Sequence, residues 1–202
     1  MSRRDFRTKM SSADFGAISC EDDFPLDDYF AKLIDGNEKF RNIHEEFPRG
    51  YEEITLIRQL TPGQQLVILL GVLDGQVCNG GITQFFWNYP EYLFDVRDAI
   101  ERLGDSAILT NYERALEALV GKKDRWFELR KECYGNKDGP SWESFRQTYE
   151  LLDLGWFDEA YFDKRGYNDQ KEWVKLERGL QHRFLHRLAE YIRSHRSEFI
   201  EE

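Results

Sequence analysis

The sequence predicts an all-α protein, a compact single-domain helical bundle of roughly eight to ten helices around a buried central helix. Three observations favour this class. Apolar residues recur at three- and four-residue steps along most of the chain, as they do in amphipathic helices. Residues 66–73 are apolar on nearly all sides, which is typical of a helix buried on most of its surface. No segment shows the alternation of apolar and polar residues that would predict a strand.

Composition bounds the size of the protein and the partners it can bind. The chain has 202 residues, enough for one domain with a sizeable core, and its 41% hydrophobic residues exclude a disordered chain. The formal net charge of -10 repels nucleic acid and anionic lipid and attracts basic partners. Three cysteines without metal-ligand spacing predict a reduced, cytoplasmic protein. We therefore expect neither direct nucleic-acid binding nor membrane binding.

The ends of the chain differ in pattern from its middle. Residues 1–22 lack periodicity and predict a poorly ordered N-terminal tail, whereas residues 23–202 form the predicted helical domain. The basic start is not followed by an apolar run, so it does not predict a signal peptide. The run at residues 66–73 is shorter than the ~20 residues that span a bilayer. The segment from Phe24 to Glu53 has helical spacing and is the most acidic part of the chain.

The central helix has a predicted start and a predicted end. Thr61 can cap it, Pro62 suits its first position, and Gln64 completes a capping box. The helix then runs to about Val77. Asn79-Gly80-Gly81 ends it, because a glycine in the left-handed conformation satisfies the last carbonyls at little steric cost.

The remaining helices follow from caps and breakers. A short helix is predicted at residues 82–87, a second from Pro90 to Gly104, and a third from an Asp105 cap to Gly121. Shorter helices follow at residues 126–135, after a Ser141 cap, and at residues 156–163. Asn168 is predicted to cap the longest helix, which extends to about residue 199. Its apolar stripe comprises Trp173, Leu176, Leu180, Phe184, Leu188, Tyr191 and His195.

The corner at residues 79–88 has two interpretations. In the structural one, the glycines make the turn and the amides hydrogen-bond backbone groups freed at helix ends. In the other, three aromatic residues line a pocket and the amides orient a ligand. The residues concerned are Asn79, Gly80, Gly81, Gln84, Phe85, Phe86, Trp87 and Asn88.

Other reactive side chains give weaker signals. Cys78 reads as a small buried residue rather than a nucleophile. His182, His186 and Glu190 share one helix face, but arginines surround them, so a solvated polar face is the better interpretation. No catalytic residue, metal site or cofactor is predicted.

Carboxylates fall in short rows on predicted helices. Side chains three or four residues apart lie ~5–6 Å from each other at Cβ, and a DNA strand places one phosphate every ~3.4 Å along its axis. Such a row is a coarse copy of a phosphate row, although ordinary solvated surface gives the same pattern. The candidate partner-binding residues are Glu91, Asp95 and Asp98, then Glu113 and Glu117, and finally Glu159 and Asp163.

Residues 79–88, NGGITQFFWN, resemble the signature of a bacterial family classed as a domain of unknown function, whose studied type is a DNA-mimic protein. That signature reads Asn-Gly-Gly, an apolar residue, any residue, Gln, two aromatics, any residue and Asn, and every fixed position is met. The resemblance continues to Phe157-Asp158-Glu159-Ala160-Tyr161 and further along the chain. One departure is Gln76, where the family commonly has a carboxylate.

The resemblance implies an all-helical fold and an acidic surface that occupies the DNA site of a DNA-binding protein, with a homodimer as the assembly. The leading hypothesis is therefore a non-enzymatic acidic protein that binds a basic partner, such as a DNA-binding regulator, by mimicking DNA. One alternative is a general protein-interaction or immunity-type protein whose partner is basic for other reasons. Another is an enzyme with a pocket at the corner.

Overall fold

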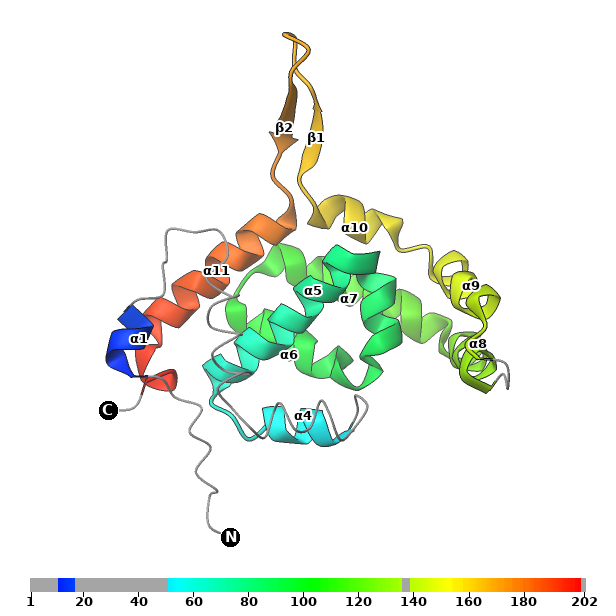
Figure 1. Cartoon of the computed structure of the whole chain (residues 1–202), viewed down its shortest axis with the longest axis horizontal. Helices are drawn as coiled ribbons and strands as arrows, with labels where there is room; N and C mark the ends of the chain where they lie inside the picture. Colours follow the sequence, from blue (N-terminus) through cyan, green and yellow to red (C-terminus); the bar gives the residue numbers. More distant parts are fainter. Residues whose placement is uncertain (1–10, 17–50, 136–138, 201–202) are drawn as a thin grey trace.

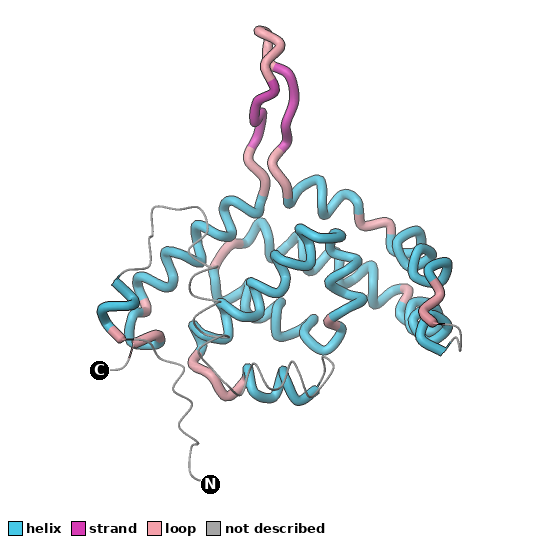
Figure 2. Tube along the Cα trace, viewed as in Figure 1, coloured by secondary structure: helices cyan, strands magenta, loops and turns pink. Residues whose placement is uncertain are grey.

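The computed structural model describes residues 11–16, 51–135 and 139–200, and it confirms a mostly helical protein with helices arranged around a long central one (Figure 1). A two-stranded hairpin projects from this helical body, and Figure 2 distinguishes it by colour. The helices are α1 (Ser12–Gly16), α4 (Tyr51–Ile57), α5 (Pro62–Asn88), α6 (Leu93–Leu103), α7 (Ser106–Gly121), α8 (Lys123–Gly135), α9 (Trp142–Leu152), α10 (Gly155–Tyr161) and α11 (Leu180–Ser194). The described residues also form two 3-10 helices, η1 (Pro90–Tyr92) and η2 (Arg196–Glu198), and two strands, β1 (Lys164–Tyr167) and β2 (Trp173–Glu177).

The central helix α5 starts as predicted. The Thr61 side chain accepts a hydrogen bond from the Gln64 backbone N–H, and the Gln64 side chain accepts one from the Thr61 N–H, so the capping box is confirmed. The Thr61 hydroxyl also donates to the Glu198 carbonyl at 2.8 Å. This contact ties the start of α5 to the C-terminal segment.

The body of α5 supplies the middle of the core. Leu66, Val67, Leu70 and Leu73 are fully or almost fully buried. By length and composition, α5 is also the one helix among the described residues that could cross a membrane. Since most of the apolar window of α5 is buried within the protein, its hydropathy is that of a core helix.

The predicted break in α5 is confirmed. Gly80 (φ -164°, ψ 27°) and Gly81 (φ 76°, ψ 176°) leave helical geometry, and a second helical segment continues from Ile82 to Asn88. Gly81 occupies the left-handed range of φ that side chains disfavour. Two helical segments therefore meet at an angle at this position, as the Asn79-Gly80-Gly81 sequence predicts.

Most of the other predicted boundaries agree with the structure. Pro90 opens η1, which leads into α6, and α6 ends at the left-handed Gly104. Asp105 caps α7 by accepting a hydrogen bond from the Ala107 N–H at 3.0 Å, and Ser141 caps α9. These signals are local in the sequence, which is why they can be read without the fold.

The expectation of a strand-free protein is wrong at residues 164–177. β1 and β2 pair antiparallel, with Tyr167 opposite Trp173. The Asn168 side chain accepts hydrogen bonds from the Gln170 and Glu172 N–H groups, at 3.0 and 2.9 Å, and so closes the hairpin turn. An asparagine acceptor stabilises a turn and a helix start by the same chemistry, which explains why Asn168 was misread as a helix cap.

The predicted longest helix is accordingly shortened to α11. Trp173 and Leu176, at the start of the predicted apolar stripe, are exposed on β2, and His195 at its end is exposed as well. Phe184 and Leu188 are buried as predicted. The helical spacing that links Trp173 and Leu176 to Leu180 is therefore coincidental, because the first two residues lie in β2 and the third begins α11.

The predicted tail at residues 1–22 lies largely outside the described residues, as does the acidic segment up to residue 50. Within the tail, α1 is helical, and the Phe15 ring stacks on Phe199 at 6.1 Å between centroids. Figure 1 shows α1 beside the C-terminal end of the chain. This part of the tail therefore has a docking partner in the body, while the boundary at residue 22 stays a prediction.

Candidate functional site at the glycine corner and on the acidic surface

The backbone groups exposed by the break in α5 are bound by side chains from two other helices. The Asp158 carboxylate on α10 accepts a hydrogen bond from the Ile82 N–H at 2.9 Å. The Tyr149 hydroxyl on α9 donates to the Gly80 carbonyl at 2.9 Å. A Cβ on Gly81 would overlap the Asp158 carboxylate, so this close approach also requires glycine. The corner is a junction of three helices.

The amides of the corner bind one another. Gln84 Nε2 and Asn88 Nδ2 both donate to Gln76 Oε1, at 3.1 and 2.6 Å, and Asn79 is exposed. The expectation that Gln84 and Asn88 hydrogen-bond backbone groups is therefore wrong. Gln76 acts here as an acceptor. A carboxylate at this position could accept the same two hydrogen bonds.

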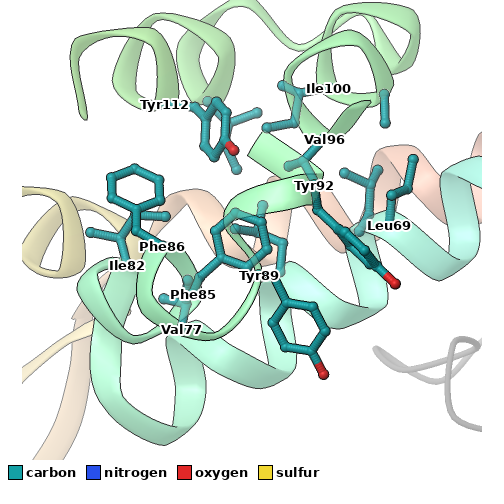
Figure 3. Close-up of a cluster of buried hydrophobic side chains, with 14 of the residues drawn as sticks. Leu69, Val77, Ile82, Phe85, Phe86, Tyr89, Tyr92, Val96, Ile100 and Tyr112 are labelled. Atoms are coloured by element: carbon teal, nitrogen blue, oxygen red, sulfur yellow. The ribbon is translucent and has the colours of Figure 1, made fainter. Parts of the chain in front are cut away.

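The aromatic residues of the corner are core residues. Phe85, Phe86 and Trp87 are all buried. Figure 3 shows Phe85 and Phe86 close to Tyr112, whose ring centroid lies 6.4 and 6.3 Å from theirs. The Trp87 indole N–H donates to the Tyr134 hydroxyl at 3.0 Å. These rings belong to the hydrophobic core and hold α5 against its neighbours.

A second polar cluster lies one turn earlier on α5. Asp74 accepts hydrogen bonds from the Tyr161 hydroxyl at 2.7 Å and from Gln181 Nε2 at 2.8 Å. Cys78, expected to be buried, is exposed beside this carboxylate. Partial burial and then the Asp74 charge raise the pKa of the Cys78 thiol. A nucleophilic cysteine needs the opposite shift, so Cys78 is not activated here.

An open hollow of about 420 Å³ lies next to the corner, at the base of the hairpin. Burial raises the pKa of the Asp158 carboxyl, although the Ile82 N–H opposes this shift. The hollow is not the ligand pocket considered from the sequence, because neither Asn79 nor Gln84 lines it. Its lining residues are Gly155, Asp158, Glu159, Phe162, Asp163 and Lys164.

The histidines of α11 stand on a polar face, as predicted. His182 Nδ1 lies 3.5 Å from the Arg178 guanidinium, and His186 is exposed. Across the residues that the structure describes, no group of three histidine, cysteine or carboxylate side chains could hold a metal ion.

Four of the seven candidate carboxylates are tied to a basic side chain. Asp95, whose side chain is 18% exposed, accepts hydrogen bonds from Nε and Nη2 of Arg58, at 2.8 and 2.7 Å. Arg97 binds both Asp98 (3.1 Å) and Glu113 (2.8 Å). Asp163 pairs with Lys175 and also accepts the Gly179 N–H at 2.9 Å, which lowers its pKa.

The other three candidates carry uncompensated charge. Glu91 lies on η1, Glu117 on α7 and Glu159 on α10, and all three are exposed. None of them makes an ion pair with a residue that the structure describes. The sequence shows that arginines interrupt the rows, and Arg97 does neutralise part of one. The sequence does not show that Arg58, which lies 37 residues before Asp95, binds that carboxylate.

Charge is unevenly distributed along the chain. Residues 51–163 contain twenty carboxylates and eleven basic residues, and residues 17–50 contain nine and four. Residues 164–200, which form the hairpin, α11 and η2, reverse this balance with nine basic residues and five carboxylates. The protein therefore combines an acidic body with a basic hairpin and last helix.

Comparison with known proteins gives one match. A family model described as DMP19-like protein matches residues 58–195, which include the corner, both polar clusters and the hairpin. Neither a curated protein nor a solved structure matches the chain.

Proposed function

The chain belongs to the DMP19-like family of DNA-mimic proteins, and from this membership we propose that it binds a DNA-binding protein by occupying that protein's DNA site. The protein acts in this proposal without catalysis or cofactor, as an acidic surface presented to a basic groove. It works in the cytoplasm, where its three cysteines stay reduced.

The charge distribution is the observation that best supports this role. The acidic excess lies in residues 17–163, while residues 1–16 and 164–200 carry more basic than acidic side chains. A DNA-binding groove is lined by lysines and arginines that neutralise phosphates. An acidic body offers the same groups a carboxylate surface and attracts them over several ångströms before contact.

The ion pairs decide which carboxylates are free to make this contact. We assign the contact to Glu91, Glu117 and Glu159, which are exposed and unpaired with described residues, together with Asp98, whose side chain is 70% exposed. Asp95 and Glu113 are held by arginines, and Asp163 is held by Lys175. Breaking these pairs would cost part of the binding energy.

The test begins with capture of the partner and ends with competition. The partner should release the protein when duplex DNA is added, and its affinity should fall steeply as salt rises, because contacts between exposed charges are screened. The triple variant Glu91→Gln, Glu117→Gln, Glu159→Gln should weaken binding about tenfold, at ~0.5 kcal/mol for each charge. Its matched control, Glu172→Gln, Glu177→Gln, Glu190→Gln, removes the same charge from the basic side and should have little effect.

Two results would contradict the proposal. One is a partner that binds the protein and its own DNA together, and the other is binding that is equally strong in high salt. Either would favour the alternative of a general interaction protein.

A further inference from the structure

The hairpin formed by β1 and β2 projects from the helical body between α10 and α11 (Figure 1). Among the described residues, its two strands pair only with each other. A two-stranded hairpin is at best marginally stable alone in water, so a projecting ribbon of this kind contributes little to the stability of the body. The large side chains that it presents to solvent therefore need an explanation other than folding.

One face of the hairpin carries two large exposed rings. Tyr167 and Trp173 are 69% and 59% exposed, and they pack edge to face with 5.0 Å between their ring centroids. The two residues are opposite each other in the strand register, so their side chains leave the ribbon on the same face. An exposed aromatic ring can stack on another flat π-system, and every nucleic-acid base offers one.

The same face carries cations next to the rings. Arg165 is opposite Lys175 in the register, two residues from Tyr167 and Trp173, so strand alternation places all four residues on one face. Arg165, and Arg178 directly after β2, are exposed, and neither makes an ion pair with a described residue. Two guanidinium groups that are free of carboxylates therefore follow the ring pair towards α11.

The carboxylates of the hairpin limit the path of an anionic ligand. Those nearest the body are neutralised, because Glu177 pairs with Lys164 at 2.9 Å and Asp163 pairs with Lys175. The turn at the outer end carries two further carboxylates, Asp169 and Glu172. An anionic chain is therefore directed from the rings towards α11 and not over the turn.

The net charge of -10 argues against nucleic-acid binding by the protein as a whole, but the rings lie away from most of this charge. Tyr167 lies three residues beyond the start of β1, which places it about 10 Å further from the body. Exposed charges separated by more than about 8 Å are largely screened at physiological ionic strength. The field at the rings is therefore set by residues 164–200, in which nine basic residues outnumber five carboxylates.

We propose that the hairpin binds single-stranded nucleic acid, with a base stacked on Tyr167 and Trp173 and the neighbouring phosphates held by Arg165 and Arg178. Two residues along a strand separate the rings from Arg165 by about 7 Å, so adjacent groups of one strand reach both. The bases of a duplex are stacked on each other, so the rings favour an unpaired strand. The proposal does not rest on the DNA-mimic function, because the acidic body takes no part in this contact.

The first test measures fluorescence anisotropy of labelled oligodeoxyuridylate and oligouridylate, each of about twelve nucleotides, as the full chain is added. The two probes differ only in the 2′-hydroxyl, so tighter binding of one assigns the site to DNA or to RNA, and equal binding assigns it to both. A duplex of the same length should bind more weakly than either probe.

The ring contact is tested by three substitutions. Trp173→Ser should weaken binding about tenfold, as the loss of one stacked base does, whereas Trp173→Phe keeps a ring and should keep most of the affinity. The matched control is Trp142→Ser, which removes a still more exposed tryptophan from α9 and should leave binding unchanged.

The phosphate contact is tested through salt dependence. Arg165→Gln should weaken binding about threefold and should lower the slope of log K against log salt concentration by about 0.7, the value for one phosphate of a single strand. Arg165→Lys keeps the charge and should keep the slope. Arg125→Gln removes an exposed arginine from α8 and should change neither quantity.

Three results would overturn the proposal. They are an anisotropy that neither probe raises at low salt, a duplex that binds as tightly as the single strands, and binding that Trp173→Ser and Trp142→Ser affect equally. A hairpin whose ligand is an acidic protein would give the first of these. None of the three bears on the proposed function, which is tested with the partner protein.

Discussion

Two aromatic stretches of this chain have similar composition and opposite environments. Phe85, Phe86 and Trp87 at the corner are buried, whereas Tyr167 and Trp173 are more than half exposed on the hairpin at residues 164–177, which we call the arm. The corner aromatics fill the space between α5, α7 and α8, and the arm aromatics contact mainly each other. Residue type alone therefore does not distinguish a core element from a contact surface.

The polar groups differ in the same way. At the corner, the Gly80 carbonyl and Ile82 N–H are bound by side chains from distant parts of the sequence. On the arm, Asn168 binds only its immediate neighbours, and Arg165 stays free of ion pairs with described residues. The corner holds the fold together, while the arm is attached to it and available for contact.

The largest expected effect separates the two aromatic groups directly. Phe86→Ala should destabilise the protein by about 4 kcal/mol, because it leaves a cavity in the core. Trp173→Ala should cost less than about 1 kcal/mol, since an exposed cross-strand pair contributes little. Chemical denaturation at low protein concentration measures both, and equal losses would remove the distinction between corner and arm.

The next effect tests the turn of the corner. Gly81→Val should destabilise the fold by about 3 kcal/mol, because valine disfavours the positive φ and meets Asp158. Gly75→Val is the matched control on the same helix, where an added Cβ meets open space. Thermal unfolding compares the two, and an unchanged melting temperature for Gly81→Val would show that this glycine is not required.

A smaller effect is expected from Asp158, the partner of the corner backbone. Asp158→Leu removes the acceptor of the buried Ile82 N–H and should cost about 2 kcal/mol, whereas Asp158→Asn keeps an oxygen there and should cost less. Urea denaturation at neutral pH separates the two variants. Equal losses for Leu and Asn would contradict the role of this hydrogen bond.

The same residue gives the corner a pH dependence. Burial raises the pKa of the Asp158 carboxyl above its ordinary value of 3.8, so the folded state holds this proton more tightly than the unfolded state. The protonated Asp158 carboxyl therefore stabilises the folded state fully below pH 3.8, and this contribution to the free energy of unfolding decreases as pH rises through the folded pKa. Asp158→Asn lacks this titration and should gain stability relative to the wild type over that window.

The smallest effect concerns the arm. Asn168→Ala removes the acceptor that closes the hairpin turn and should lower the local stability of the arm by about 1 kcal/mol. Amides of the arm should then exchange with solvent about fivefold faster. The global unfolding transition should stay where it is, and Asn168→Asp should behave like the wild type. A shift of the global transition would mean that the arm supports the fold.

The parts of the structure that the sequence predicts are those with local causes. Thr61 and Gln64, Asp105, Gly81 and Gly104 act on their own helix ends, and their roles follow from neighbouring residues. The partners of the corner could not be found in this way. Asp158 lies 76 residues from Ile82, and only packing of α10 on α5 brings them together.

The arm escaped prediction because two helical signals were coincidental. Asn168 offered an acceptor suited to a helix start, and Trp173, Leu176 and Leu180 kept a helical spacing. Gly179 was the sign against one long helix. A Cβ there would overlap the backbone at Tyr161 and Phe162, so the chain needs glycine where the arm rejoins the body.

Hydrogen exchange of the wild-type protein, followed residue by residue, tests the contrast between corner and arm most directly. The Ile82 amide should be strongly protected, because Asp158 of the same chain binds it and Ile82 is buried. Amides of β1 and β2 should exchange much faster, because the exposed hairpin can open without unfolding the helical body. Arm amides that are protected as strongly as the Ile82 amide would contradict the account.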